Sequence, residues 1–250
     1  MQRLDKLIAS QGVRSRSETV KLIRSGQVTV NGVVCRSPSQ KVNTDIDRVS
    51  VSGELLNYQE YVYIMMNKPA GILCVSRDPK VKTVVDLLPE EMRRKHLFPA
   101  GRLDKDTVGL VLLTDDGDFA HRILSPKQDV VKRYHVRLDG PLTDEHCRAF
   151  EQGIVLADGT PCRPARLIIL EDTPQPLAEV QITEGRYHQV KRMFGVIDRG
   201  VDWLKRVSIG AVDHYLAPST PALIKSVGQL KNFIKAVYIK ITGFFEKLIV

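Results

Sequence analysis

The chain has 250 residues, of which 43% are hydrophobic and 26% are charged, and its formal net charge is +8 at pH 7. These proportions are typical of a globular protein and exclude a disordered or fibrous chain. No uncharged apolar stretch reaches the roughly 18 residues that a membrane span requires, and the charged start of the chain lacks a signal-peptide core. Four cysteines are scattered without C-x-x-C spacing, which argues against zinc or disulfides and favours a cytoplasmic protein. The basic excess suits a polyanionic partner, although charge alone leaves nucleic acid at even odds.

Residues 1–58 are predicted to form a separate small module. Apolar residues at positions 4, 7 and 8 give one helical face, and Ser15 with Glu18 forms a capping-box pattern that opens a second helix. Gly26 is expected to end that helix. Asn31-Gly32, between two short valine-rich runs, is a strong hairpin signal.

This order of two helices followed by the hairpin QVTVNG resembles the S4 RNA-binding domain. The resemblance implies that basic residues on or beside the two helices bind RNA. A solvated charged face is the alternative for the same residues. The candidates for RNA contact are Arg3, Lys6, Arg14, Arg16, Lys21 and Arg24.

Residues 61–211 are predicted to form a second, larger domain, joined to the first by a linker at 55–60. Strands are expected at 61–66, 110–114, 132–138 and 177–182, and the first of them is broken by Asn67-Lys68-Pro69-Ala70-Gly71. One helix is expected after the turn Asp115-Asp116-Gly117, up to Leu124, and another from Thr143 to Gly153. Several hairpins and few βαβ units predict an α+β fold with a mixed, mainly antiparallel sheet flanked by helices.

The stretch from Phe98 to Leu124 carries the strongest indication of chemistry. Asp104 lies in a polar loop between Gly101 and Gly109, directly before an apolar strand. A loop at the start of a buried strand can hold a reactive side chain rigidly. Other aspartates nearby are better explained as turn and cap residues.

Four segments in this order resemble motifs of the pseudouridine synthase family that modifies ribosomal RNA. GRLDKDTVGLVLLTDDGDFAHRI is similar to its second motif and MMNKPAGILCVS to its first, KRYHV looks like its Lys-x-Tyr strand, and ITEGRYHQVKRMF looks like its third motif. The resemblance implies a pseudouridine synthase catalytic domain. The wording EGRYHQVKRMF favours the branch acting on small-subunit 16S RNA, with the large-subunit branch as the alternative.

The family's roles transfer to matching positions. The resemblance implies that Asp104 is the catalytic carboxylate, Arg102 enters the RNA stack, Tyr134 stacks on the uracil ring, and Lys191 pairs with Asp104. A carboxylate can attack C1′ or remove the 2′ proton without a metal or cofactor, and a nearby cation keeps it ionised. We therefore expect no cofactor, and a monomer acting on ribosomal RNA or a subunit assembly intermediate.

Helical geometry supports the position of Lys191. Apolar residues between 190 and 197 repeat with helical spacing, and Lys191 lies on the flank of their stripe, roughly 110° from its centre. Arg192 lies nearer the opposite face, so it is assigned, together with Arg186, to RNA contact.

Three rival interpretations are weaker. His121, His135 and His188 lack metal-ligand spacing, so RNA-contacting or structural roles are favoured. The sequence from Asp104 to Thr107 spells the D-x-D-x-T pattern of phosphatases, but the apolar strand follows it instead of preceding it. A non-catalytic RNA-binding or ribosome-assembly factor would not need Asp104, Tyr134 and Lys191 together.

Residues 212–250 depart from the family pattern. They mix apolar residues with lysines, which predicts a basic amphipathic segment that covers the core, binds RNA or lies on a membrane surface.

Overall fold

The computed structural model describes residues 1–12, 14–210, 212–213 and 222–223. Contacts divide the chain into two compact units, Met1–Val62 with Leu88–Leu97, and Tyr63–Leu87 with Phe98–Val250. Most of the predicted amphipathic segment 212–250 lies outside the described residues. Within the described ranges, no helix combines the length and apolar character needed to cross a membrane.

The first unit begins with two helices whose ends follow the sequence signals. They are α1 (Leu4–Ser10) and α2 (Arg16–Arg24). Ser15 and Glu18 form the expected capping box, in which the Glu18 carboxylate accepts from the Ser15 amide at 2.8 Å. Gly26 follows the helix with φ of +82°, a left-handed conformation that glycine adopts without steric cost.

A small antiparallel sheet completes this unit. Its strands pair in the order β3-β2-β5-β6, and a separate two-stranded ladder pairs β1 with β4. The strands are β1 (Gln2–Arg3), β2 (Val28–Val30), β3 (Val33–Val34), β4 (Lys41–Val42), β5 (Val49–Val51) and β6 (Glu54–Leu55). Asn31 and Gly32 both have positive φ, as a type I′ hairpin requires, so the predicted hairpin is confirmed. The helices and the sheet bury a common core that includes Leu4, Leu7, Ile23 and Val28.

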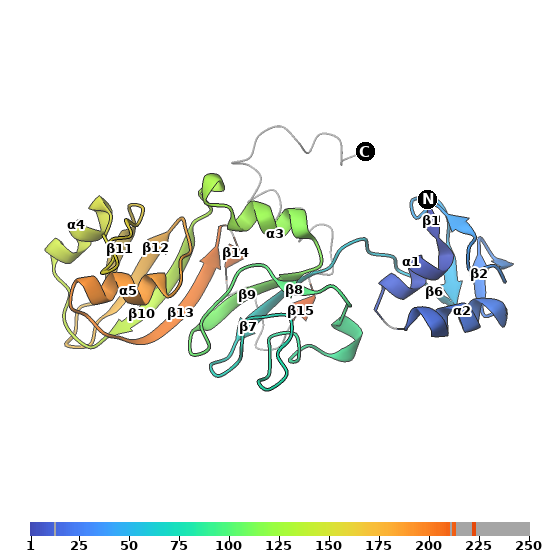
Figure 1. Cartoon of the computed structure of the whole chain (residues 1–250), viewed down its shortest axis with the longest axis horizontal. Coiled ribbons are helices and arrows are strands. Elements are labelled where there is room, and N and C mark those ends of the chain that lie inside the picture. The colour runs from blue at the N-terminus through green and yellow to red at the C-terminus, as the bar shows by residue number, and fades with distance from the viewer. Residues whose placement is uncertain (13, 211, 214–221, 224–250) are drawn as a thin grey trace. The chain divides into compact units, whose positions relative to one another are not determined.

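The second unit is built on one sheet in the order β11-β12-β10-β13-β9-β7-β15, with β14 pairing β13 and β8 pairing β9 (Figure 1). Its strands are β7 (Tyr63–Lys68), β8 (Phe98–Pro99), β9 (Val108–Thr114), β10 (Lys132–Leu138), β11 (Arg166–Glu171), β12 (Leu177–Ile182), β13 (Val201–Ile209), β14 (Val212–Asp213) and β15 (Ala222–Leu223). Among the described strands, only β13 and β9 pair in parallel. The predicted mixed, mainly antiparallel sheet is therefore confirmed.

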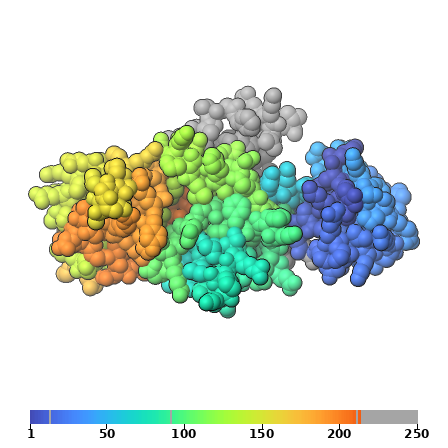
Figure 2. Space-filling view, viewed as in Figure 1, coloured from blue at the N-terminus to red at the C-terminus, as the bar shows by residue number. Residues whose placement is uncertain are grey.

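Three helices pack on this sheet: α3 (Gly117–Leu124), α4 (Asp144–Gln152) and α5 (Gln189–Val196). The chain also has two short 3-10 turns, η1 (Glu90–Met92) in the first unit and η2 (Pro126–Gln128) in the second. Helix α3 packs Phe119 and Ile123 against β9. Helices α4 and α5 meet through Phe150 and Phe194, whose ring centroids are 5.0 Å apart. In the space-filling view, side chains of the second unit close over the spaces between these elements (Figure 2).

Two predicted strands have different bounds in the structure: the strand predicted at 110–114 begins at Val108 in β9, and that predicted at 61–66 begins at Tyr63 in β7. The strand expected to end at Met66 continues in β7 through Asn67 to Lys68. Lys68 pairs with Gly109 of β9, and its side chain is only 1% exposed. The strand continues because Asn67 and Lys68 pair with β9, and backbone carbonyls surround the buried ammonium group of Lys68.

Candidate active site

A short loop between β8 and β9 carries Asp104, and Lys68 anchors that loop. The Lys68 ammonium donates to the backbone carbonyls of Lys105 at 3.0 Å and Thr107 at 2.8 Å, and also to Pro69 at 3.1 Å. Burial lowers the pKa of Lys68, and the nearby carboxylates of Asp104 and Asp106 partly offset that effect. These hydrogen bonds therefore fix the conformation of the loop around Asp104, whose residues Arg102, Lys105 and Asp106 are exposed.

Two cationic or titratable groups from the start of α5 surround the Asp104 carboxylate. His188 Nε2 lies 3.3 Å from Asp104 Oδ1, and Lys191 Nζ lies 3.8 Å from Asp104 Oδ2. The Asp104 side chain keeps 26% of its exposure, so a ligand can reach it.

Lys191 lies within ion-pair distance of Asp104, and it also has a nearer partner, Asp106. Lys191 Nζ lies 2.8 Å and 2.6 Å from the two oxygens of Asp106. This hydrogen bond with Lys191 lowers the pKa of Asp106. The helical flank predicted for Lys191 does point it toward the loop, but two carboxylates lie within its reach.

Tyr134 lies on β10, opposite Arg206 of β13, and is only 8% exposed. Residues alternate along the strand, so Lys132, Tyr134 and Val136 are buried on one sheet face. Tyr134 makes no hydrogen bond or ion pair with Asp104 or Lys191 in the described part of the chain. The structure thus brings Asp104, His188 and Lys191 into direct contact, while Tyr134 lies apart from them on β10.

Buried positive charge accompanies Tyr134 on this face. Arg206 donates from Nε to the Leu110 carbonyl at 2.8 Å, while its buried Nη2 has no hydrogen-bond partner among the described residues. Burial lowers the pKa of Lys132 to about 8, and the neighbouring charges of Arg206 and Arg163 act in the same direction. The sheet face that carries Tyr134, Lys132 and Arg206 is therefore electropositive.

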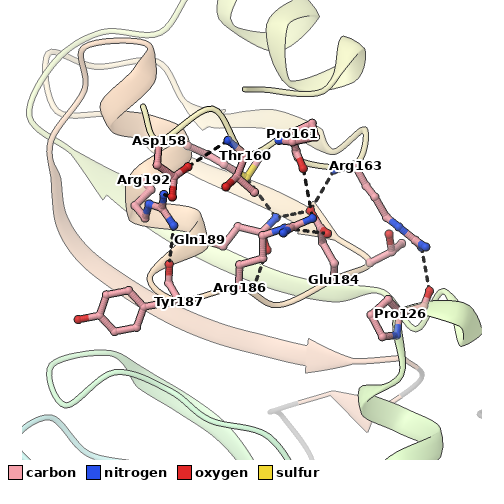
Figure 3. A network of polar contacts seen from close by, with 12 residues as sticks. Pro126, Asp158, Thr160, Pro161, Arg163, Glu184, Arg186, Tyr187, Gln189 and Arg192 are labelled. Carbon is pink, nitrogen blue, oxygen red and sulfur yellow. Dashed lines mark hydrogen bonds and ion pairs between the residues drawn. The ribbon is translucent and has the colours of Figure 1, made fainter. Parts of the chain in front are cut away.

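The arginines assigned to RNA contact differ in their surroundings. Arg102 is exposed on the loop beside Asp104. Arg186 donates to Glu184 and to the Pro161 carbonyl, and Arg192 is paired with Asp158 (Figure 3). RNA phosphates would therefore compete with protein partners for Arg186 and Arg192. Arg102 forms no ion pair with a carboxylate in the part of the chain that the structure describes.

In the first unit, all six predicted RNA-contacting residues are exposed: Arg3, Lys6, Arg14, Arg16, Lys21 and Arg24. Two of them also have a structural partner. Arg3 and Arg16 each lie 3.0 Å from the buried carboxylate of Asp5, and the hydrogen bond from Arg3 is the main cause of the lowered pKa of Asp5.

The sequence interpretation missed His188 as a neighbour of Asp104. His188 is the N-cap of α5 and has φ of +48°, which is uncommon for a residue other than glycine. Its spacing of three from Lys191 was the available signal, because residues three apart lie on the same side of a helix. No cluster of three or more potential metal ligands occurs among the described residues.

A partly exposed carboxylate beside a histidine and a lysine, on a domain with a basic sheet face, suits an enzyme that acts on an anionic substrate. Comparisons with known proteins give its family. Residues 62–195 match the model of RNA pseudouridylate synthase, and residues 2–45 match that of the S4 domain. The chain belongs to the RNA pseudouridylate synthase family.

Relatives and a solved structure cover most of the chain. An uncharacterized RNA pseudouridine synthase of Bacillus subtilis is 44% identical over 86% of this chain and 92% of that protein. The ribosomal small subunit pseudouridine synthase A of Escherichia coli K12 is 41% identical over 86% and 93%. A crystal structure of a pseudouridylate synthase matches with a TM-score of 0.60 and 38% identity, covering 92% of this chain and 99% of that one.

Proposed function

We propose that this protein converts a uridine of small-subunit ribosomal RNA into pseudouridine, with Asp104 as the catalytic carboxylate. The observation that carries the target is the 41% identity, over most of both chains, to enzymes named ribosomal small subunit pseudouridine synthase A. The observation that carries the mechanism is Asp104, which lies reachable between His188 and Lys191.

The reaction breaks the C1′–N1 bond, turns the uracil, and forms a C1′–C5 bond while the C5 proton is lost and N1 gains one. The target base must leave the RNA stack to reach a protein carboxylate. Asp104 either attacks C1′ or removes the 2′ proton, and both routes need the ionised form. Lys191 and His188 both lie within 4 Å of that carboxylate.

Tyr134 and the exposed arginine have complementary roles in the proposal. The buried ring of Tyr134 stacks on the uracil and excludes water, so that the base is not lost to hydrolysis. Arg102, on the rim of the loop, occupies the space that the flipped base leaves in the RNA. None of these steps calls for a metal or a cofactor, and the S4 module supplies additional RNA contact through its exposed basic residues.

Release of tritium from uridine C5 tests the proposal. Small-subunit RNA labelled at C5, both free and in partly assembled particles, is incubated with the native protein and with Asp104→Asn. We expect release by the native protein alone, because asparagine keeps the side-chain shape but carries no charge. RNA binding by both proteins, measured in parallel, confirms that the variant remains folded.

The choice of RNA separates the alternatives. Release from large-subunit RNA alone would assign the protein to that branch. No release from any ribosomal RNA or particle, together with tight binding, would leave a non-catalytic RNA-binding factor.

A further inference from the structure

Tyr187 is an exposed aromatic residue directly beside the candidate active site. Its side chain is 76% exposed, although large aromatic rings usually bury most of their surface. One face of the ring stacks on His188, with centroids 3.9 Å apart and planes inclined by 17°. Such exposure indicates that the rest of the ring is available to a ligand.

The backbone of Tyr187 is held in place while its ring points away from the protein. Arg192 donates to the Tyr187 carbonyl at 3.5 Å and is itself paired with Asp158. The Arg186 amide donates to the Gln189 side chain at 2.9 Å, so the turn before α5 is fixed on both sides of Tyr187. Figure 3 shows the ring directed away from this network. A ring presented in this way is preorganised, and a ligand does not have to order it.

The stack leads from Tyr187 to the catalytic carboxylate. His188 contacts Tyr187 through its ring face and Asp104 through Nε2, at 3.3 Å. A base on the free face of Tyr187 is thus separated from Asp104 by the tyrosine ring, the imidazole ring and one polar contact of 3.3 Å. That is the neighbourhood in which the nucleotides adjoining a flipped uridine must lie.

The surroundings fit an RNA segment. Exposed Arg186 precedes Tyr187, and Lys191 lies on the same turn as His188. Cations interleaved with an exposed aromatic ring bind single-stranded nucleic acid, because phosphates meet the cations while any base can stack on the ring.

We propose that Tyr187 is a stacking platform for the base of a nucleotide that flanks the target uridine, with His188 as the positioning residue between that platform and Asp104. This assignment rests on the proposed function. The platform recognises a base through its π-face, so it requires a base at the flanking position but tolerates different ones.

Steady-state kinetics of Tyr187→Ala and Tyr187→Phe, with a minimal RNA substrate, test the platform. Loss of one stacked base should raise KM for Tyr187→Ala about tenfold and leave kcat within about twofold, while Tyr187→Phe should behave like the native protein. Tyr61→Ala is the matched control, because Tyr61 is also an exposed tyrosine but belongs to the first unit.

Abasic substrates provide the decisive comparison. The nucleotides on either side of the target are replaced, one at a time, by an abasic residue. At one position, the native protein should show the same rise in KM as Tyr187→Ala, and the variant should show no further rise, because both changes remove the same contact.

Each alternative outcome decides the question. An unchanged KM for Tyr187→Ala, or additive losses at every abasic position, would overturn the platform while leaving the enzyme's function intact. A fall in kcat at constant KM would overturn it in favour of a purely structural effect on Asp104. If the native protein releases no tritium from any ribosomal RNA, the proposed function fails, and the platform fails with it.

Discussion

Lys191 holds both carboxylate oxygens of Asp106, at 2.8 and 2.6 Å. Asp104 lies farther from the same ammonium group, at 3.8 Å, and interacts with it more weakly. Asp106 is 72% exposed, so this stronger pair lies on the rim, where solvent screens it. The arrangement makes Asp106 a competitor of Asp104 for one cation.

Replacement of Asp106 should therefore leave the catalytic rate largely intact, whereas loss of Lys191 should not. In Asp106→Asn, Lys191 loses its nearer partner and is free to approach Asp104, so kcat should stay within about threefold of the native value. Lys191→Met removes the ammonium group beside Asp104, and kcat should fall more than about tenfold. Single-turnover kinetics at one pH measure both effects.

Asp172→Asn is the control, since Asp172 is an exposed carboxylate in the turn between β11 and β12. It should leave kcat unchanged. A kcat in Lys191→Met as high as that in Asp172→Asn would show that Lys191 does not support Asp104.

The Lys68 ammonium should be required to hold the catalytic loop. Lys68→Met leaves the buried carbonyls of Lys105 and Thr107 without their donor, which should lower the free energy of unfolding by about 2–4 kcal/mol. Because the loop positions Asp104, kcat should fall more than tenfold while KM for RNA changes little. Urea denaturation and single-turnover kinetics measure the two effects.

Lys82→Met provides the comparison on an exposed lysine of the same unit. It should cost less than about 0.5 kcal/mol of stability. Native-like kcat in Lys68→Met would show that the loop keeps its conformation without the three hydrogen bonds.

Much of the fold was predictable because its signals are local. The strand predicted at 132–138 and that predicted at 177–182 match β10 and β12, since alternate burial of their side chains is visible in the sequence. Helix α3 begins after Asp116, whose side chain accepts from the Phe119 amide at 2.9 Å, as the turn signal predicts.

The site was only partly predictable, because its contacts join residues far apart in the chain. Lys68 meets carbonyls 37 and 39 residues away, so nothing near it indicates that a charged residue continues a buried strand. Lys191 and Asp106 are 85 residues apart, and helical spacing gives the direction of Lys191 but cannot choose between two carboxylates. The left-handed conformation of His188 likewise has no local sequence signal.

The buried ammonium of Lys132 should make stability depend on pH in the alkaline range. Burial lowers its pKa in the folded protein from 10.5 to about 8. The unfolded chain therefore binds more protons between these values, and the free energy of unfolding rises as pH increases from about 8 to about 10.5. Lys132→Met removes this contribution and should stabilise the protein at pH 7 by at most about 3 kcal/mol.

Urea denaturation between pH 7 and 10.5 checks the difference between Lys132→Met and the native protein. The gain should shrink steadily as pH rises, whereas Lys127→Met, a change at an exposed lysine of the same unit, should show no such trend. A gain that is independent of pH would assign the effect to packing instead of charge.

Gly109 should be irreplaceable for steric reasons. It has φ of +103°, and a Cβ atom there would lie 2.2 Å from the backbone oxygen of Arg206, in the parallel pairing of β9 with β13. Gly109→Ala must separate these two strands at the point where the Asp104 loop enters the sheet. It should cost more than about 3 kcal/mol in urea denaturation and lower kcat as well.

Gly159→Ala separates the steric clash from backbone strain. Gly159 also has positive φ, at +79°, but a Cβ atom there meets nothing within 4 Å. Its replacement should cost only about 1–2 kcal/mol, the usual penalty for a side chain in the left-handed region. Equal costs at the two positions would mean that β9 and β13 can move apart freely, and the loop that carries Asp104 would then have no rigid base.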